Sequence, residues 1–167
     1  EMIKFERGSN GRISRVTYPD LGERTITYDT ANRPQSVTLP QGTVVTLAHD
    51  SIGRESARTT STAEFRYLTY GTGNRVETMQ DNSGTTTYSY DNAGRFCGIT
   101  YPSGASVMYT RDVLDRTTDV RVKPNATASE IVTHYEYDEN GNLAKIIDPN
   151  NGVTGFSSDD ADRLEQR

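Results

Sequence analysis

The sequence predicts an all-β fold, a spiralling array of β-hairpins that repeats about every 21 residues within an open or shell-like sheet. Three observations support this prediction. A six-residue motif recurs at nearly constant spacing, the residues before it alternate between polar and apolar, and the composition is rich in Thr and Tyr. Each repeat is therefore expected to contribute two short strands and two turns.

A hexad of the type Tyr90-Asp91-Asn92-Ala93-Gly94-Arg95 defines the repeat, and we call its first residue the reference position. Five of the seven intervals between successive hexads are 21 residues, and the other two are 20 and 26 residues. The hexads begin at Arg7, Tyr28, His49, Tyr70, Tyr90, Arg111, Tyr137 and Ser158. Eight units in nearly constant register indicate a repeat array across the whole chain.

The strand before each hexad carries an apolar or aromatic residue two places before the reference position, which we call the apolar column. Its members are Phe5, Ile26, Leu47, Leu68, Tyr88, Tyr109, Tyr135 and Phe156. The segment Thr86-Thr87-Tyr88-Ser89-Tyr90 shows the period of two that is typical of a strand with one buried face.

The hexad itself predicts a tight turn. Asp follows the reference position in six units, and an Asp carboxylate can accept backbone N–H bonds two residues on. Four places after the reference position, at what we call the turn position, stand Gly11, Asn32, Gly53, Asn74, Gly94, Asp115, Gly141 and Asp162. These residue types tolerate a positive φ. Arg follows the turn position in seven units, where it can pair with the Asp of its own turn or of a neighbouring one.

A second strand follows the turn and ends in a second turn. The second strands share an apolar position, interrupted by Arg58 and Arg167, whose other members are Val16, Val37, Met79, Ile99, Val120 and Ile146. The second turns are expected at Pro19 to Gly22, Pro40 to Gly42, Asp81 to Gly84, Pro102 to Gly104 and Asp148 to Gly152. The interval of 26 residues indicates a five-residue insertion in a polar loop around Lys123 to Glu130, and we do not expect its Asn125-Ala126-Thr127 tripeptide to be glycosylated.

Composition restricts the partners. The chain has 167 residues, a net charge of −5 and 32% hydrophobic residues, with ten Tyr and no Trp. An acidic chain is not expected to bind nucleic acid. Cys97 is the one cysteine, which excludes an internal disulfide framework and a cysteine-based zinc site. No apolar run reaches the roughly 18 residues of a membrane span, and no signal peptide occupies residues 1 to 30, so we expect export signals outside this segment.

The hexads resemble the YD repeats of the RHS family, and the resemblance runs from Phe5 to Arg163. The hexads that carry it best are Tyr28-Asp29-Thr30-Ala31-Asn32-Arg33, Tyr90-Asp91-Asn92-Ala93-Gly94-Arg95 and Tyr137-Asp138-Glu139-Asn140-Gly141-Asn142. Such repeats occur in bacterial polymorphic toxins, in insecticidal toxin complexes and in teneurins. The resemblance implies a large hollow shell made from a spiralling β-sheet, which in the bacterial members encloses a toxic C-terminal domain.

No residues predict catalysis, a cofactor or a metal. His49 and His134 lie in different units, and His49 stands at a reference position, where packing is the simpler role. Asp138-Glu139-Asn140-Gly141-Asn142 has its Gly at the fourth place, although a calcium loop of this type needs it at the sixth. Asp148-Pro149-Asn150-Asn151-Gly152 resembles the cleavage sequence of the toxin members superficially, but it coincides with a second turn.

We therefore expect residues 1–167 to be a single repeat segment, a fragment of a longer protein that lacks capping units. Its expected function is structural, as wall of a secreted or surface-exposed bacterial shell that encloses a toxin or effector. Its partners would be the rest of that shell and the enclosed domain. A glycan- or protein-binding repeat module, a β-propeller of four-stranded blades and, last, an enzyme are the alternatives.

Overall fold

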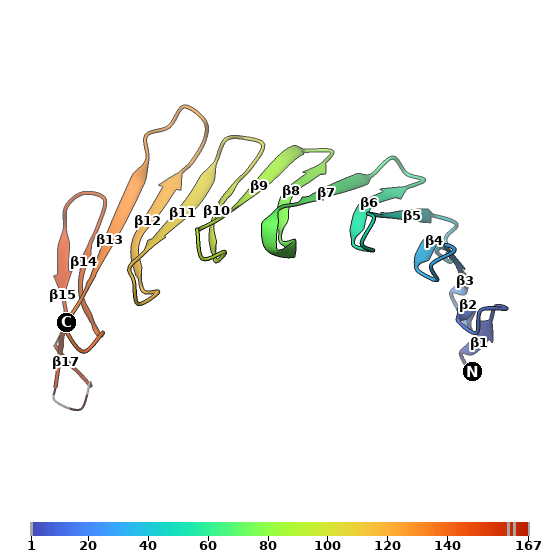
Figure 1. Cartoon of the computed structure of the whole chain (residues 1–167), viewed down its shortest axis with the longest axis horizontal. Helices are drawn as coiled ribbons and strands as arrows, with labels where there is room; N and C mark the ends of the chain where they lie inside the picture. Colours follow the sequence, from blue (N-terminus) through green and yellow to red (C-terminus); the bar gives the residue numbers. More distant parts are fainter. Residues whose placement is uncertain (1, 160, 162, 167) are drawn as a thin grey trace. The chain divides into compact units, whose positions relative to one another are not determined.

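The structure, a computed structural model, describes residues 2–159, 161 and 163–166. Within these residues it has fifteen strands in one antiparallel sheet and two in a second sheet (Figure 1). The strand order of the large sheet is the order along the chain, so successive strands are neighbours. The predicted all-β array of hairpins is confirmed, and the coiling of the sheet stays a prediction.

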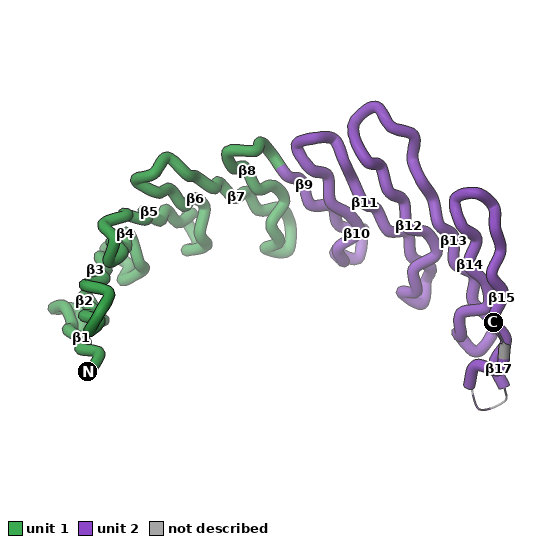
Figure 2. The backbone as a smooth tube through the Cα atoms, turned by 180° about the vertical axis from the view of Figure 1, so that it is seen from behind, with its two compact units in different colours: residues 1–85 green, residues 86–167 purple. Residues whose placement is uncertain are grey.

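The chain divides into two compact units, residues 1–85 and 86–167 (Figure 2). The strands that begin in the first unit are β1 (Lys4–Arg7), β2 (Ile13–Tyr18), β3 (Gly22–Tyr28), β4 (Pro34–Thr38), β5 (Val44–His49), β6 (Glu55–Thr60), β7 (Phe65–Tyr70), β8 (Val76–Asp81) and β9 (Gly84–Tyr90). Strands β1 to β8 follow one another in a single sheet, so the alternative of four-stranded propeller blades is wrong.

The second compact unit, residues 86–167, continues the same pattern. Its further strands are β10 (Phe96–Thr100), β11 (Ser106–Arg111), β12 (Thr117–Lys123), β13 (Ile131–Tyr137), β14 (Leu143–Ile147), β15 (Val153–Gly155), β16 (Ser157–Ser158) and β17 (Leu164–Gln166). The insertion forms the loop between β12 and β13, as predicted. The eighth repeat was expected to continue the large sheet. Instead, the chain leaves the large sheet after Gly155, and β16 pairs with β17 alone.

The pairing register places the two predicted apolar positions opposite each other. The cross-strand pairs are Phe5↔Val16, Ile26↔Val37, Leu68↔Met79, Tyr88↔Ile99, Tyr109↔Val120 and Tyr135↔Ile146. Because side chains alternate between the two faces of a strand, the paired residues within each compact unit lie on one face of its strands, which we call the apolar face. Leu47 is paired with Arg58 in the third repeat, and there the apolar face becomes polar.

Few side chains on the apolar face are buried. Among the described residues, the buried apolar side chains are Val16 and Val37, which are 7% and 8% exposed. No described side chain is less than 2% exposed. The sheet therefore gains little from a packed interior, and contacts between neighbouring strands and repeats have to provide much of its stability.

The tight turns share one backbone geometry. In the second repeat, the N–H of Asn32 donates to the carbonyl of Asp29 at 2.9 Å, and the N–H of Asp29 donates to the carbonyl of Arg33 at 2.9 Å. A bulge shifts the register at Thr27/Tyr28. This is a turn closed by a left-handed residue in a bulge. The residues at the turn position have φ between 62° and 94°, namely Gly11, Asn32, Gly53, Asn74, Gly94, Asp115 and Gly141, whereas Asp162 lies outside the described residues.

The second turns often reuse this geometry at the opposite edge of the sheet. Gly42, Gly104 and Asn151 have positive φ there, and each donates its N–H to the carbonyl three residues earlier. The predicted second turns are confirmed between the corresponding strands. The sequence analysis missed one second turn, at Ser61 to Glu64, where Ala63 has a φ of 66°. It also missed the short 3-10 helix η1 (Thr72–Asn74).

Candidate functional site: the repeat interface and a paired-arginine pocket

Five of the tight turns are closed by an Asp–Arg pair, which we call the turn clamp. One carboxylate oxygen of Asp29 accepts the backbone N–H groups of Ala31 and Arg33, at 2.9 and 2.8 Å. Its other oxygen accepts the Nε–H of Arg33 at 2.8 Å. Equivalent ion pairs join Asp50 to Arg54, Asp91 to Arg95, Asp112 to Arg116 and Asp159 to Arg163. The predicted pairing of Arg with the Asp of its own turn is confirmed.

The turn clamp lowers the pKa of its carboxyl group. At Asp91 the backbone N–H of Arg95 has the largest effect in lowering the pKa, and the Arg95 guanidinium adds to it against the opposing effect of desolvation. At Asp50 desolvation raises the pKa, but the hydrogen bonds from Arg54 outweigh it and the net shift is downward. The clamp therefore favours the charged carboxylate, which is the form that accepts these hydrogen bonds.

The arginine of a clamp also reaches the next repeat. The Nη1 of Arg54 donates to the Oδ1 of Asn74, the turn-position residue of the following unit, at 2.5 Å. The guanidinium of Arg54 also lies over the ring of Tyr70, with its carbon 4.1 Å from the ring centre. Arg116 lies over Tyr137 in the same way, at 4.6 Å. One side chain thus closes its own turn and contacts two residues of the next repeat.

The tyrosine at the reference position bonds back to the preceding repeat. The hydroxyl of Tyr70 donates to the carbonyl of Glu55 at 2.6 Å, and Tyr28 and Tyr137 make equivalent bonds to the carbonyls of Ile13 and Thr117, each at 2.8 Å. The accepting residue is in each case the first one after the preceding hexad. This bond explains the tyrosine of the motif, a role that the sequence analysis did not identify.

Arg111 replaces tyrosine at a reference position and makes the same connection. Its Nη1 donates to the carbonyl of Phe96 at 2.9 Å, at the same offset of 15 residues as in Tyr70 and Glu55. The neighbouring turn-position residue is Asp115, whose Oδ1 lies 2.6 Å from Arg95 and 3.4 Å from Arg111. Asp115 offsets the positive charge that Arg111 adds beside Arg95. Arg in place of Tyr at this reference position therefore preserves the contact between repeats.

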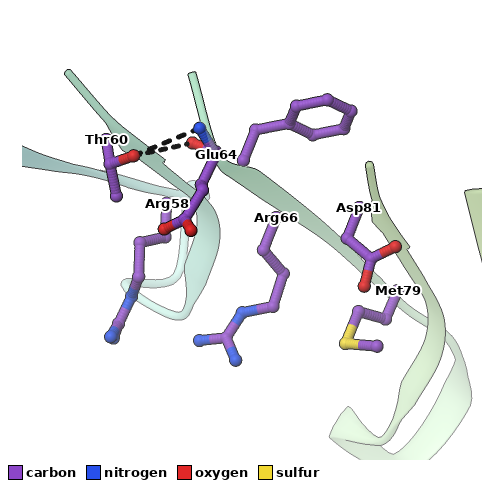
Figure 3. A pocket seen from close by; sticks show the side chains of 7 residues that line it. Arg58, Thr60, Glu64, Arg66, Met79 and Asp81 are labelled. Atoms are coloured by element: carbon purple, nitrogen blue, oxygen red, sulfur yellow. Dashed lines mark hydrogen bonds between the residues drawn. The ribbon is translucent and has the colours of Figure 1, made fainter. Parts of the chain in front are cut away.

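A pocket of about 410 Å³ around Arg58 and Arg66 interrupts the apolar face (Figure 3). These two arginines are cross-strand partners on β6 and β7, and their guanidinium groups lie on the same side of the pocket. Glu55 holds both, at 2.7 Å from Arg58 and 3.1 Å from Arg66. Met79 and Asp81 of β8 complete the side of the pocket next to Arg66.

The other candidate groups do not converge. His134 and Asp119 are cross-strand partners, with Nδ1 and Oδ1 2.8 Å apart, and this hydrogen bond is the main cause that lowers the pKa of Asp119. His49 is half-buried in β5 and Cys97 is half-buried in β10. Among the described residues, no group of three or more His, Cys, Asp or Glu side chains lies close enough together to hold a metal ion. In the same part of the chain, no helix has the length and apolarity to span a membrane.

The apolar column lies along the apolar face without forming a site. Phe5 is 61% exposed on the first strand, and the other members are half-buried. The last member, Phe156, lies between β15 and β16 and donates its N–H to the carbonyl of Ala144. Asp148 to Gly152 forms the second turn between β14 and β15, with two backbone N–H groups bonded to the Asp148 carboxylate.

Comparison with known families gives one match. The family model described as RHS Repeat matches residues 28–64, which run from the second reference position through the third hexad to the turn before β7. The predicted resemblance to this family is confirmed in that stretch.

Several solved structures resemble the chain at low sequence identity. The structure described as TcdB2-TccC3 is 14% identical with a TM-score of 0.49, and the match covers 97% of this chain. TcdB2-TccC3 without its hypervariable C-terminal region is 13% identical with a TM-score of 0.47. The Photorhabdus luminescens Tc holotoxin pore is 13% identical with a TM-score of 0.45 over 93% of this chain. This chain spans only 10% to 11% of the length of those chains.

Proposed function

We propose that this chain, which carries an RHS repeat at residues 28–64, is a wall segment of a shell that encloses a C-terminal toxin or effector domain. The chain would be one part of a longer polypeptide made of further repeats. Its role would be to build the wall and not to catalyse a reaction. The shell would be secreted or displayed on a bacterial surface.

The observation that carries this proposal is the connection between repeats. Arg54 closes its own turn and contacts the next unit, while Tyr70 of that unit bonds back to Glu55. Such reciprocal bonds can continue for any number of units that carry the motif, because each of these repeats offers the same donors and acceptors to its neighbours. A sheet stabilised in this way can grow into a wall without a thick hydrophobic core.

The weak burial of the apolar face supports the same role. Val16 and Val37 are the buried apolar side chains in the part of the chain that the structure describes. A single sheet of this kind offers two broad surfaces, which suits a partition between two compartments. The residues that hold the fold together, the turn clamps and the tyrosines, lie at one edge of the sheet and leave both faces free to vary.

Limited proteolysis of the complete parent polypeptide tests the proposal. The C-terminal domain is expected to resist a protease while the repeat region stays intact, because the wall keeps the protease out. The same domain expressed alone is the control, and it should be digested. Equal digestion in both forms, or a parent polypeptide with no further repeats and no terminal domain, would contradict the proposal.

The alternative, a glycan-binding repeat module, has one observation in its favour. The rings of Phe65 and Tyr67 lie 5.2 Å apart, and Tyr67 is 46% exposed, so an aromatic surface is open to solvent. Sugars stack on such surfaces. Saturable binding on a glycan array that is lost in Tyr67→Ala and kept in Tyr101→Ala would favour this function.

A further inference from the structure

Arg24 is a charged side chain without a partner on the apolar face. It stands on β3 directly opposite Val16, which is 7% exposed, and is itself half-buried. Its Nε is buried and has no hydrogen-bond partner, and its guanidinium has no ion pair among the described residues. A half-buried charge without a partner raises the free energy of the ligand-free protein, and a ligand that brings an acceptor recovers part of that cost.

A pocket of about 590 Å³ lies beside Arg24, where the second turns of two consecutive repeats meet. Its apolar lining consists of Tyr18, Leu21, Leu39 and Pro40. Tyr18 is paired with Gly22 on β3, so no side chain stands opposite its ring. The volume lies in the range of pockets that take small ligands.

Asp20 gives the same pocket a negative charge. It lies exposed in the turn between β2 and β3, lines the pocket and has no ion pair in the part of the chain that the structure describes. Arg24 and Asp20 do not pair with each other, so one positive and one negative group remain available to a ligand. Asp20 repels a ligand with only a negative charge, and Arg24 repels one with only a positive charge. A ligand that carries both charges fits the pocket best.

The pocket at Arg66 has a different balance of charge. Arg66 stands four residues before a reference position, as Arg24 does, and its Nε is also buried without a partner. However, Glu55 holds its guanidinium at 3.1 Å, and Glu64 and Asp81 line that pocket as well. The charge of Arg66 is therefore already neutralised, whereas that of Arg24 is not. Arg66 provides a matched comparison at the same position of the repeat.

We propose that the pocket at Arg24 binds a free α-amino acid with an apolar side chain, in its zwitterionic form. The carboxylate of the ligand accepts hydrogen bonds from the Arg24 guanidinium, its ammonium group donates to the Asp20 carboxylate, and its side chain packs on Tyr18 and Leu39. With a hydrogen bond of about 2.8 Å at each end, such a ligand bridges protein groups roughly 8 Å apart. This inference goes beyond the proposed function, since a wall need not bind a small molecule.

Titration of L-phenylalanine into the complete 167-residue chain, labelled with nitrogen-15 and followed by NMR, tests the proposal. Saturable shifts are expected in residues 18–24 and 39–42 and in the Nε–H signal of Arg24. Arg24→Gln and Asp20→Asn should each weaken binding roughly tenfold, the loss of one charge-assisted contact. Arg66→Gln is the matched control and should leave the affinity unchanged, because Glu55 already pairs with that arginine.

Two ligands that keep only one charge make the test specific. N-acetyl-L-phenylalanine keeps the carboxylate and L-phenylalaninamide keeps the ammonium group, and each should bind the wild type at least severalfold more weakly than L-phenylalanine. Asp20→Asn should bind N-acetyl-L-phenylalanine more tightly than the wild type does, because the repulsion is removed. Arg24→Gln should likewise bind the amide more tightly. A variant that fails to fold cannot produce these gains.

The proposal is overturned if L-phenylalanine gives no saturable shifts, or if either singly charged ligand binds the wild type as tightly. It is also overturned if Arg66→Gln weakens binding as much as Arg24→Gln, or if the two expected gains are absent. None of these outcomes depends on the proteolysis result, so failure here leaves the proposed wall function standing.

Discussion

Tyr70 connects two repeats through its hydroxyl group, and removing the hydroxyl alone measures how much that hydrogen bond stabilises the fold. The Tyr70→Phe substitution keeps the ring under Arg54 but removes the bond to the Glu55 carbonyl. The free energy of unfolding should fall by about 1 kcal/mol, since the half-buried carbonyl loses its donor. Chemical denaturation measures it. Tyr101→Phe is the control, because Tyr101 is 45% exposed, and an equal loss in both variants would contradict the assigned role.

The carboxylates of the turn clamps predict a dependence of stability on pH. The hydrogen bond from the Arg95 backbone and its guanidinium lower the pKa of Asp91, so the charged clamp stabilises the fold above the pKa of an unfolded Asp, about 3.9. That stabilisation is lost as the pH falls through the lowered pKa. Asp91→Asn should therefore melt at a lower temperature than the wild type at pH 6, and the difference should shrink as the pH falls toward 2.

Thermal melting of both proteins between pH 2 and pH 6 measures this difference. Asp20→Asn is the control, because Asp20 lies exposed at the turn between β2 and β3 and has no ion pair among the described residues. Its melting temperature should follow the wild type throughout. A gap between Asp91→Asn and the wild type that stays constant down to pH 2 would show that the Asp91 charge does not stabilise the turn.

Individual residues also show what the sequence alone could predict. The Asp–Arg pairs followed from residue types four places apart across a turn. The hydrogen bond of the tyrosine hydroxyl could not be predicted in this way. Its acceptor is a backbone carbonyl 15 residues earlier, and because every residue has a backbone carbonyl, the sequence does not identify this one. Arg111 looked like a departure from the motif for the same reason, yet it donates to the equivalent carbonyl.

At the scale of the elements, the turn between β6 and β7 is an expected weak point. Ala63 has a φ of 66°, a conformation that costs an L-residue more than it costs Gly. Ala63→Gly should raise the free energy of unfolding by about 0.5–1 kcal/mol, because relief of this strain exceeds the added freedom of the unfolded chain. Chemical denaturation of the variant and the wild type measures the change.

Ala93→Gly provides the matched control in another turn. Ala93 is not among the residues with positive φ, so glycine there adds only unfolded-state entropy and should lower the free energy of unfolding by about 0.5–1 kcal/mol. Effects of the same sign in both variants would contradict the assignment of strain to Ala63.

The same turn marks a limit of sequence analysis. The other second turns were predicted from Gly, Pro or Asp, which have clear local preferences. Ser61 to Glu64 contains neither Gly nor Pro, and its geometry is imposed by the pairing of β6 with β7. The separation of β16 and β17 from the large sheet could not be predicted either, because the eighth hexad keeps the Asp and the Arg of the motif, Asp159 and Arg163.

At the scale of the whole molecule, the repeat in the sequence predicts most of the fold. The period gave the number of hairpins, the apolar column gave the face, and the long interval gave the loop between β12 and β13. The pockets at Arg24 and Arg66 were not predictable, because they depend on which side chains of three or four different strands meet.

Cryo-electron microscopy of the complete parent polypeptide tests the central claim most directly. The account predicts that residues 1–167 form an uninterrupted part of a β-sheet wall, with further RHS repeats hydrogen-bonded to its outer strands and density of the C-terminal domain enclosed behind one face. Residues 1–167 as a separate module with solvent on both faces, and no enclosed density, would contradict it.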